Sequence, residues 1–157
     1  GQAEAEPAQT WPEFAATIGA DEAPEVVGDK VAGFIEKQSP WTVSSHYRKG
    51  KGSHHNTGYG IDFSSATGPK GEVVDTDEAR ERNMDAQLAW VLKNIGRENI
   101  AELILHRVEG KKGGLVDIVY DPATGEITER SAMSMGADGK TKVTAPHLHV
   151  ALKPAAR

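Results

Sequence analysis

The chain contains 157 residues, of which 18 are Lys or Arg and 23 are Asp or Glu, so its formal net charge is −5 at pH 7. This acidic balance excludes nucleic acid as the expected main partner. No apolar run reaches the roughly 18–20 residues that span a bilayer, which excludes an integral membrane protein. The absence of cysteine rules out disulfides, thiol catalysis and thiolate metal sites. Six histidines remain, so a metal site would have to be built from imidazole and carboxylate groups.

The sequence predicts one domain with a short N-terminal extension. Residues 1–10 are rich in Ala, Glu, Gln and Pro and show no apolar period, so we expect a flexible linker or a processed N-terminus there. Residues 11–157 form the expected single domain, which is long enough to bury a hydrophobic core without covalent cross-links.

Helical and extended patterns alternate in the first half of the chain. Residues 11–39 carry a helical rhythm that Pro40 ends, and residues 41–45 are typical of a strand. A polar loop rich in Gly and His follows over 48–60, and then a short strand over 61–63. Asp75 and Thr76 are suitable caps for a helix whose apolar stripe runs to Ile95, with Gly96 at its C-terminal end.

The second half is predicted to consist mainly of strands. Strands are expected over 101–107 and 115–120, a polar loop bordering a site over 129–142, and a buried strand over 147–152. The predicted fold class is therefore α+β: a small antiparallel sheet with helices packed to one side.

The histidines concentrate in two segments, 53–62 and 146–149. Catalytic zinc takes three protein ligands and a water, and it accepts imidazole and carboxylate. His55 and Asp62 are separated by a Gly-containing turn that lets a loop residue and a strand residue converge. His147 and His149 share one face of the predicted strand, because side chains alternate along a strand.

Less specific interpretations of the same residues remain open at this point. A pair of loop histidines is often only polar surface, and Asp62 either meets a cation or caps the following turn. Tyr59 is a candidate substrate contact, or it only covers the turn. His106, on a predicted strand, is interpreted as a packed or edge histidine. The ligand types would also accept first-row metals other than zinc.

These segments resemble the LAS zinc peptidases, which include D-alanyl-D-alanine carboxypeptidases, murein endopeptidases and the hedgehog domain. The residues that carry the resemblance are Ser53-x-His55-x-x-Gly58-x-Gly60-x-Asp62, the later His147-x-His149, and the upstream segment 45–48. Gly60 replaces the small Ala of the family motif. The resemblance implies a hedgehog-like or D-Ala-D-Ala peptidase-like fold with one zinc ion in a cleft on the sheet.

The resemblance also implies roles for individual residues. His55, Asp62 and His149 would bind zinc. Arg48 would bind a substrate carboxylate or peptide carbonyl, with a solvated loop charge as the alternative. Ser53 would support the loop or the Asp62 carboxylate by hydrogen bonding, and it is also a candidate substrate contact.

Many family members carry a carboxylate general base just before the last zinc histidine, but residues 142–148 contain none. His147 is therefore the candidate base, with Asp138 or Glu129 as alternatives. The expected function is hydrolysis of a peptide bond in bacterial peptidoglycan by a secreted, extracellular or periplasmic protein, or by one delivered by a phage or as a toxin. The alternative is a non-catalytic, zinc-stabilised, hedgehog-like binding module.

Overall fold

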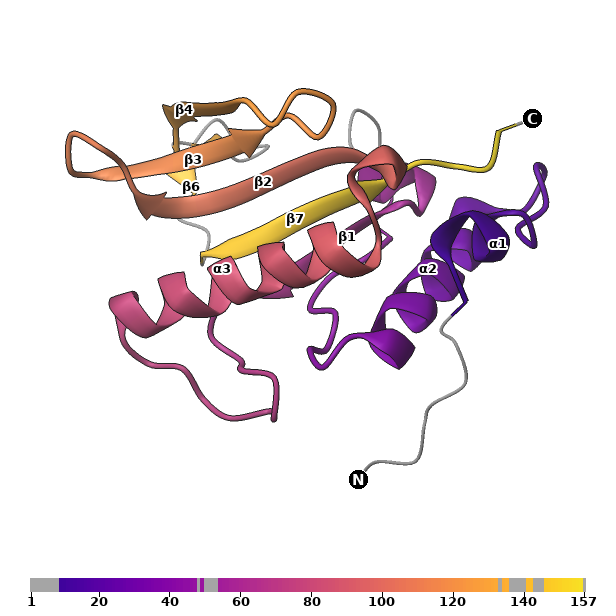
Figure 1. The fold of residues 1–157 in the computed structure, drawn as a ribbon, viewed down its shortest axis with the longest axis horizontal. Helices are drawn as coiled ribbons and strands as arrows, with labels where there is room; N and C mark the ends of the chain where they lie inside the picture. The colour runs from indigo at the N-terminus through magenta and orange to yellow at the C-terminus, as the bar shows by residue number, and fades with distance from the viewer. Residues whose placement is uncertain are drawn as a thin grey trace.

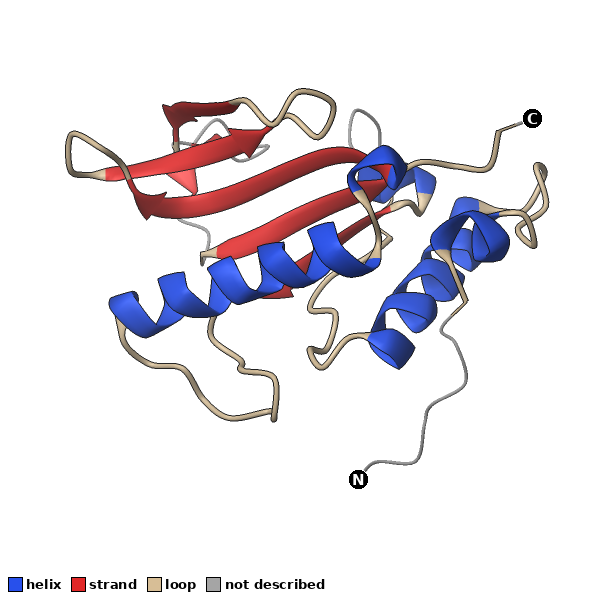
Figure 2. Cartoon of the chain, viewed as in Figure 1, coloured by secondary structure: helices blue, strands red, loops and turns tan. Residues whose placement is uncertain are grey.

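A computed structural model describes residues 9–47, 49, 54–132, 134–135, 141–142 and 146–156. Its centre is a five-stranded sheet with the order β1-β7-β2-β3-β4, in which every neighbouring pair is antiparallel (Figures 1 and 2). The strands are β1 (Gly60–Ser64), β2 (Ile100–Glu109), β3 (Leu115–Tyr120), β4 (Ile127–Ser131) and β7 (His147–Leu152). The predicted α+β class with an antiparallel sheet is confirmed.

The described residues contain the α-helices α1 (Trp11–Ala15), α2 (Pro24–Gln38) and α3 (Asp77–Asn94), and short 3-10 turns form η1 (His54–Thr57) and η2 (Arg97–Asn99). The helical rhythm predicted over 11–39 is confirmed and is divided between two helices, α1 and α2. Thr10 and Glu13 cap the N-terminus of α1 with reciprocal hydrogen bonds, a capping box. Pro24 is the first residue of α2, a position where its missing N–H costs no helical hydrogen bond. Among the described residues, no helix combines the length and apolar character needed to cross a bilayer.

Helix α3 lies along one face of the sheet (Figure 1). Its start agrees with the prediction, since the Thr76 side chain accepts a hydrogen bond from the Ala79 N–H. Gly96 follows its end with φ of 92°, a conformation that glycine adopts without steric cost. Met84 and Val91 of α3 are buried in the hydrophobic core, together with apolar strand residues.

Strand β7 lies inside the sheet although it comes last in the chain, because it pairs with β1 on one side and β2 on the other. Leu148, Val150 and Leu152 belong to the hydrophobic core. His147 and His149 alternate with them and therefore point to the opposite face. The predicted buried strand is confirmed, and the register of β7 decides which residues meet its histidines.

Two other segments differ from the sequence predictions. Residues 41–45 form no continuous strand; Ser45 makes only an isolated bridge to Asp62. Strand β4 lies within a region predicted in part to be loop, and all its residues are exposed. A solvated edge strand needs no apolar alternation, so its sequence resembles that of a loop. The small pair β5 (Ser134–Met135) and β6 (Thr141–Lys142) lies in the same predicted loop.

Candidate metal centre

Three segments bring two histidines and one carboxylate together. Asp62 of β1 lies directly opposite His149 of β7 in the antiparallel register. Directly opposed residues place their side chains on the same face of a sheet. Turn η1 comes just before β1 and contributes His55. A loop residue and two strand residues therefore meet, as the spacing of the sequence motif predicts.

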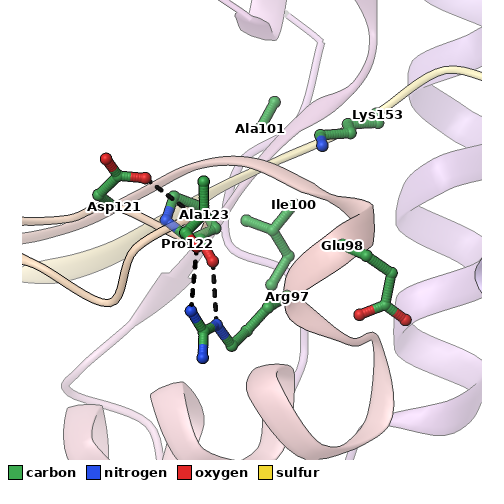
Figure 3. A pocket seen from close by; sticks show the side chains of 8 residues that line it. All are labelled: Arg97, Glu98, Ile100, Ala101, Asp121, Pro122, Ala123 and Lys153. Atoms are coloured by element: carbon green, nitrogen blue, oxygen red, sulfur yellow. Dashed lines mark hydrogen bonds between the residues drawn. The ribbon is translucent and has the colours of Figure 1, made fainter.

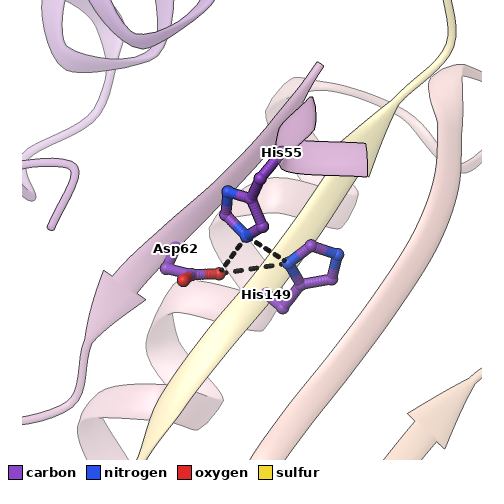
Figure 4. Close-up of side chains that lie close together, drawn as sticks. All are labelled: His55, Asp62 and His149. Atoms are coloured by element: carbon purple, nitrogen blue, oxygen red, sulfur yellow. Dashed lines mark hydrogen bonds and ion pairs between the residues drawn. The ribbon is translucent and has the colours of Figure 1, made fainter. Parts of the chain in front are cut away.

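The polar atoms of these three side chains form a nearly equilateral triangle (Figure 4). His55 Nε2 lies 3.1 Å from Asp62 Oδ1 and 3.1 Å from His149 Nδ1, and the remaining edge, from His149 Nδ1 to Asp62 Oδ1, is also 3.1 Å. The three residues are only 3%, 3% and 6% exposed. Such a buried His–Asp–His group can hold a metal ion.

In both histidines of the triad, the ring nitrogen that points away from the triad has a hydrogen-bond partner, and this partner determines whether the inner nitrogen carries a proton or a lone pair. His55 Nδ1 donates to the backbone carbonyl of His46 at 2.7 Å, and His149 Nε2 donates to the Glu102 carboxylate at 2.9 Å. A carbonyl and an ionised carboxylate can only accept, so both outer nitrogens carry their protons. In the neutral rings, His55 Nε2 and His149 Nδ1 then present lone pairs to Asp62. Three acceptors at this spacing favour a cation between them.

The donor set and its spacing fit zinc. Four tetrahedral ligands about 2.05 Å from a zinc ion would lie about 3.3 Å from one another. The observed separations of 3.1 Å need only a small expansion to reach this value. Three protein ligands leave a fourth position for water or substrate, which is the composition of catalytic rather than structural zinc sites.

The electrostatics of the metal-free centre show the same preference for positive charge. Burial acts to raise the pKa of Asp62, but its close contacts with the His149 and His55 rings outweigh it and hold this pKa well below its usual value. Burial likewise acts to lower the pKa of His149, yet hydrogen bonds to Asp62 and Glu102 raise this pKa to about 9. The centre therefore retains a proton on His149 when no metal ion replaces it.

The backbone around the ligands is held at several points. The Asp62 N–H donates to the Ser45 carbonyl at 2.8 Å, and the Ser44 N–H donates to the Asp62 carbonyl at 2.8 Å. Gly58 lies between His55 and Asp62 with φ of 88°, and a Cβ built on it would lie 2.5 Å from the Pro24 carbonyl oxygen. The motif glycine thus lets the metal loop approach the start of α2, which no larger residue would allow.

Two further imidazoles lie beside the triad on the same face. His147 Nε2 is 3.9 Å from Asp62 Oδ2. The His106 ring of β2 stacks on the His147 ring, with centroids 4.5 Å apart and planes at 25°. Burial and the neighbouring His147 lower the pKa of His106, although Asp117 opposes this shift. His106 is therefore kept mainly neutral near pH 7 and able to accept a proton.

His106 was not among the site residues predicted from the sequence. The signal that could have found it is the register of the sheet, because His106 is directly opposite His147 in the β2–β7 pair. A single sequence gives strand positions but not which strands become neighbours, so a histidine 41 positions upstream of His147 could not be assigned to the site.

The other predicted site residues have different outcomes. Arg48, Ser53 and Asp138 lie outside the described residues. Tyr59 packs edge-on against Trp11, with ring centroids 6.2 Å apart. Glu129 accepts a hydrogen bond from the Lys111 N–H at 2.8 Å in the β2–β3 hairpin. The structure therefore does not bring Tyr59 or Glu129 into the histidine–aspartate cluster.

A surface depression of about 610 Å³ lies elsewhere, where η2 and the start of β2 face the turn after β3 (Figure 3). Its Arg97 side chain donates to the carbonyls of Pro122 and Ala123 at 2.9 and 3.3 Å. Arg97 therefore connects η2 to the turn that follows β3. None of the triad residues lines the depression.

Comparison with protein-family models, with curated proteins and with solved structures gave no match.

Proposed function

We propose that the chain is a zinc-dependent peptidase that hydrolyses a peptide bond in the stem peptides or crossbridges of bacterial peptidoglycan. The observation that carries this proposal is the convergence of three buried acceptor atoms within 3.1 Å of one another, each on a side chain of the LAS-like motifs. The donor set supports a bound metal ion, whereas zinc as its identity and peptidoglycan as the substrate rest on the motif resemblance. A secreted protein, or one delivered by a phage or as a toxin, would meet this substrate.

The neighbouring side chains suit hydrolysis at such a centre. When bound, zinc lowers the pKa of a coordinated water towards ~7 and polarises the scissile carbonyl. His147 is placed beside Asp62 on the metal face, where it can take the proton of the attacking water and later pass it to the leaving amine. Formation of the bond from water oxygen to carbonyl carbon is then balanced by cleavage of the carbon–nitrogen bond. Arg48 remains the proposed substrate-orienting residue.

A second candidate function is a non-catalytic, zinc-stabilised binding module like the hedgehog branch. The observation that favours it is that the carboxylates nearest the triad already interact with the ligand histidines. Asp62 faces the two ligand histidines, and Glu102 accepts from His149. Among the described residues, no other carboxylate is placed as a general base in direct contact with the triad. Catalysis then depends on the histidines.

Metal content and cleavage should be measured on the same preparation. We expect about one zinc ion per chain and release of fragments with one defined cleaved bond when the protein is incubated with peptidoglycan, followed by mass spectrometry. His147→Ala should keep zinc and lower kcat by roughly 100-fold or more, because a general base is lost. His149→Ala, two positions along the same strand, should lose zinc as well as activity.

The other outcomes separate the two candidates. Zinc without cleavage of any peptidoglycan type would favour the binding module. A wild-type chain that binds no metal ion would overturn both, and loss of zinc in His147→Ala would show that the ligands are wrongly assigned.

A further inference from the structure

A strained bulge interrupts strand β2 next to the metal face. Leu105 pairs with Ile118 and Val108 pairs with Val116, so two residues of β2, His106 and Arg107, lie opposite one residue of β3. Such bulges redirect side chains and are common beside active sites. Arg107 has φ of 63° and is the one non-glycine residue with positive φ in the described part of the chain. Residues other than glycine adopt this left-handed conformation only at a cost in free energy, so the surrounding structure must hold it in place.

The residue opposite the bulge is Asp117, a carboxylate that is only 7% exposed. Its Oδ1 accepts from the Arg107 N–H at 3.1 Å, and its Oδ2 lies 3.1 Å from His106 Nδ1. Arg130 Nε of strand β4 is 3.8 Å from the same Oδ2. One buried carboxylate therefore contacts both residues of the bulge, the backbone of one and the ring of the other.

This contact fixes the form of the His106 ring. An ionised carboxylate only accepts hydrogen bonds, so Nδ1 carries the proton and Nε2, on the other side of the neutral ring, keeps its lone pair. The same ring stacks on His147 and lies edge-on to His149 at a centroid distance of 6.3 Å. His106 thus reaches the metal face as a hydrogen-bond acceptor.

We propose that Asp117 is a positioning residue: together with the bulge at Arg107, it holds His106 in the Nδ1–H tautomer, stacked on His147, so that Nε2 accepts a hydrogen bond from the attacking water or the substrate. This inference depends on the proposed peptidase function. Asp117 touches neither the metal ligands nor the water; it acts through the His106 ring. A similar relation between a buried aspartate and a histidine sets the tautomer in serine proteases.

The first test is Asp117→Asn in the zinc-loaded chain. The Asn carbonyl oxygen can still accept from the Arg107 N–H, but its NH₂ group would face His106 Nδ1 and force the proton to Nε2. We expect kcat to fall roughly tenfold or more with KM and zinc content unchanged, because only a group that acts during the reaction is lost. Asp121→Asn is the matched control: Asp121 directly follows strand β3 and its side chain accepts from the Ala123 N–H, away from the histidine cluster, so activity should stay at the wild-type level.

The second measurement does not need a substrate. Long-range nitrogen-15 correlation spectra of the zinc-loaded wild type should show His106 protonated at Nδ1, and those of Asp117→Asn should show it protonated at Nε2. Wild-type kcat in Asp117→Asn, or a wild-type His106 protonated at Nε2, would overturn the inference. If the wild type binds zinc but cleaves nothing, the peptidase proposal fails, and with it the catalytic role of Asp117, whereas the spectra still decide whether Asp117 sets the tautomer.

Discussion

Glu102 holds one proton of the metal centre in place, the proton on His149 Nε2. Its carboxylate accepts from His149 Nε2 at 2.9 Å, and this leaves Nδ1 as the nitrogen that faces Asp62 and His55. Carboxylates that hydrogen-bond a metal-binding histidine orient its ring and make it a better ligand. Glu102 is therefore part of the centre even though it lies outside the triad.

Removal of this carboxylate should weaken zinc binding without unfolding the protein. Glu102→Ala is expected to raise the Kd for zinc roughly 10- to 100-fold, the usual effect of losing such a partner, and Glu102→Gln should lie between it and the wild type, because an amide oxygen still accepts. Competition titration with a chelating dye measures this. Glu109→Ala, at the far exposed end of the same strand, is the control. Equal affinity in Glu102→Ala and wild type would show that the ring of His149 is held by its strand alone.

At the scale of elements, the metal loop depends on how closely η1 and β1 approach helix α2. A Cβ at position 58 would lie 2.5 Å from the Pro24 carbonyl oxygen and 2.7 Å from the Gly28 backbone nitrogen. Neither atom can move without shifting the start of α2. The loop that carries His55 is thus positioned by a helix, not only by its own turn.

Gly58→Ala should therefore lower the stability of the protein by more than the backbone strain of its positive φ alone would. Gly71 is a matched control, because it also has positive φ (76°, against 88° for Gly58) but has nothing within 4 Å of an added Cβ. We expect Gly71→Ala to lose roughly 1–2 kcal/mol of stability from backbone strain. Gly58→Ala should lose clearly more and bind zinc more weakly, as measured by urea unfolding and zinc titration. An equal loss of stability in the two variants would mean that α2 shifts to accommodate the added methyl group without disturbing the loop.

The elements also show what the sequence can predict. Helix α3 and strand β7 were predicted because caps and apolar alternation are local signals. The proximity of the candidate ligands His55, Asp62 and His149 was predicted because they occur in motifs that are local in sequence. His106 and Asp117 were not, since their proximity depends on the β2–β7 and β2–β3 registers and on a bulge. Strand β4 was missed because its exposed residues show no apolar pattern.

At the scale of the whole molecule, the charged state of the centre links stability to pH. The pKa of His149 is raised to about 9 in the folded metal-free chain, against 6.5 for an unperturbed histidine. A raised pKa means that the folded state binds the proton more tightly, so this contribution is complete below about pH 6.5 and is lost as the pH rises through about 9.

The melting temperature of the metal-free chain should therefore fall between pH 6.5 and 9.5. Saturating zinc should remove this decline, because the metal ion replaces the proton between His149 and Asp62. Differential scanning fluorimetry with a chelator and with zinc makes the comparison, and His149→Gln should lack the decline when metal-free. A wild-type melting temperature that is independent of pH in this range without metal would contradict the assigned cause.

Strand β7 joins β1 to the β2–β3–β4 half of the sheet, and it also carries His149. During synthesis, β1 leaves the ribosome long before β7 does, so without β7 the strand β1 has no partner strand in the sheet and only two of the three candidate metal ligands are present. Insertion of β7 closes contacts that are distant in sequence, which is a slow type of folding event. The complete metal centre, and any hydrolytic activity that depends on it, can therefore form only after nearly the whole domain has been translated.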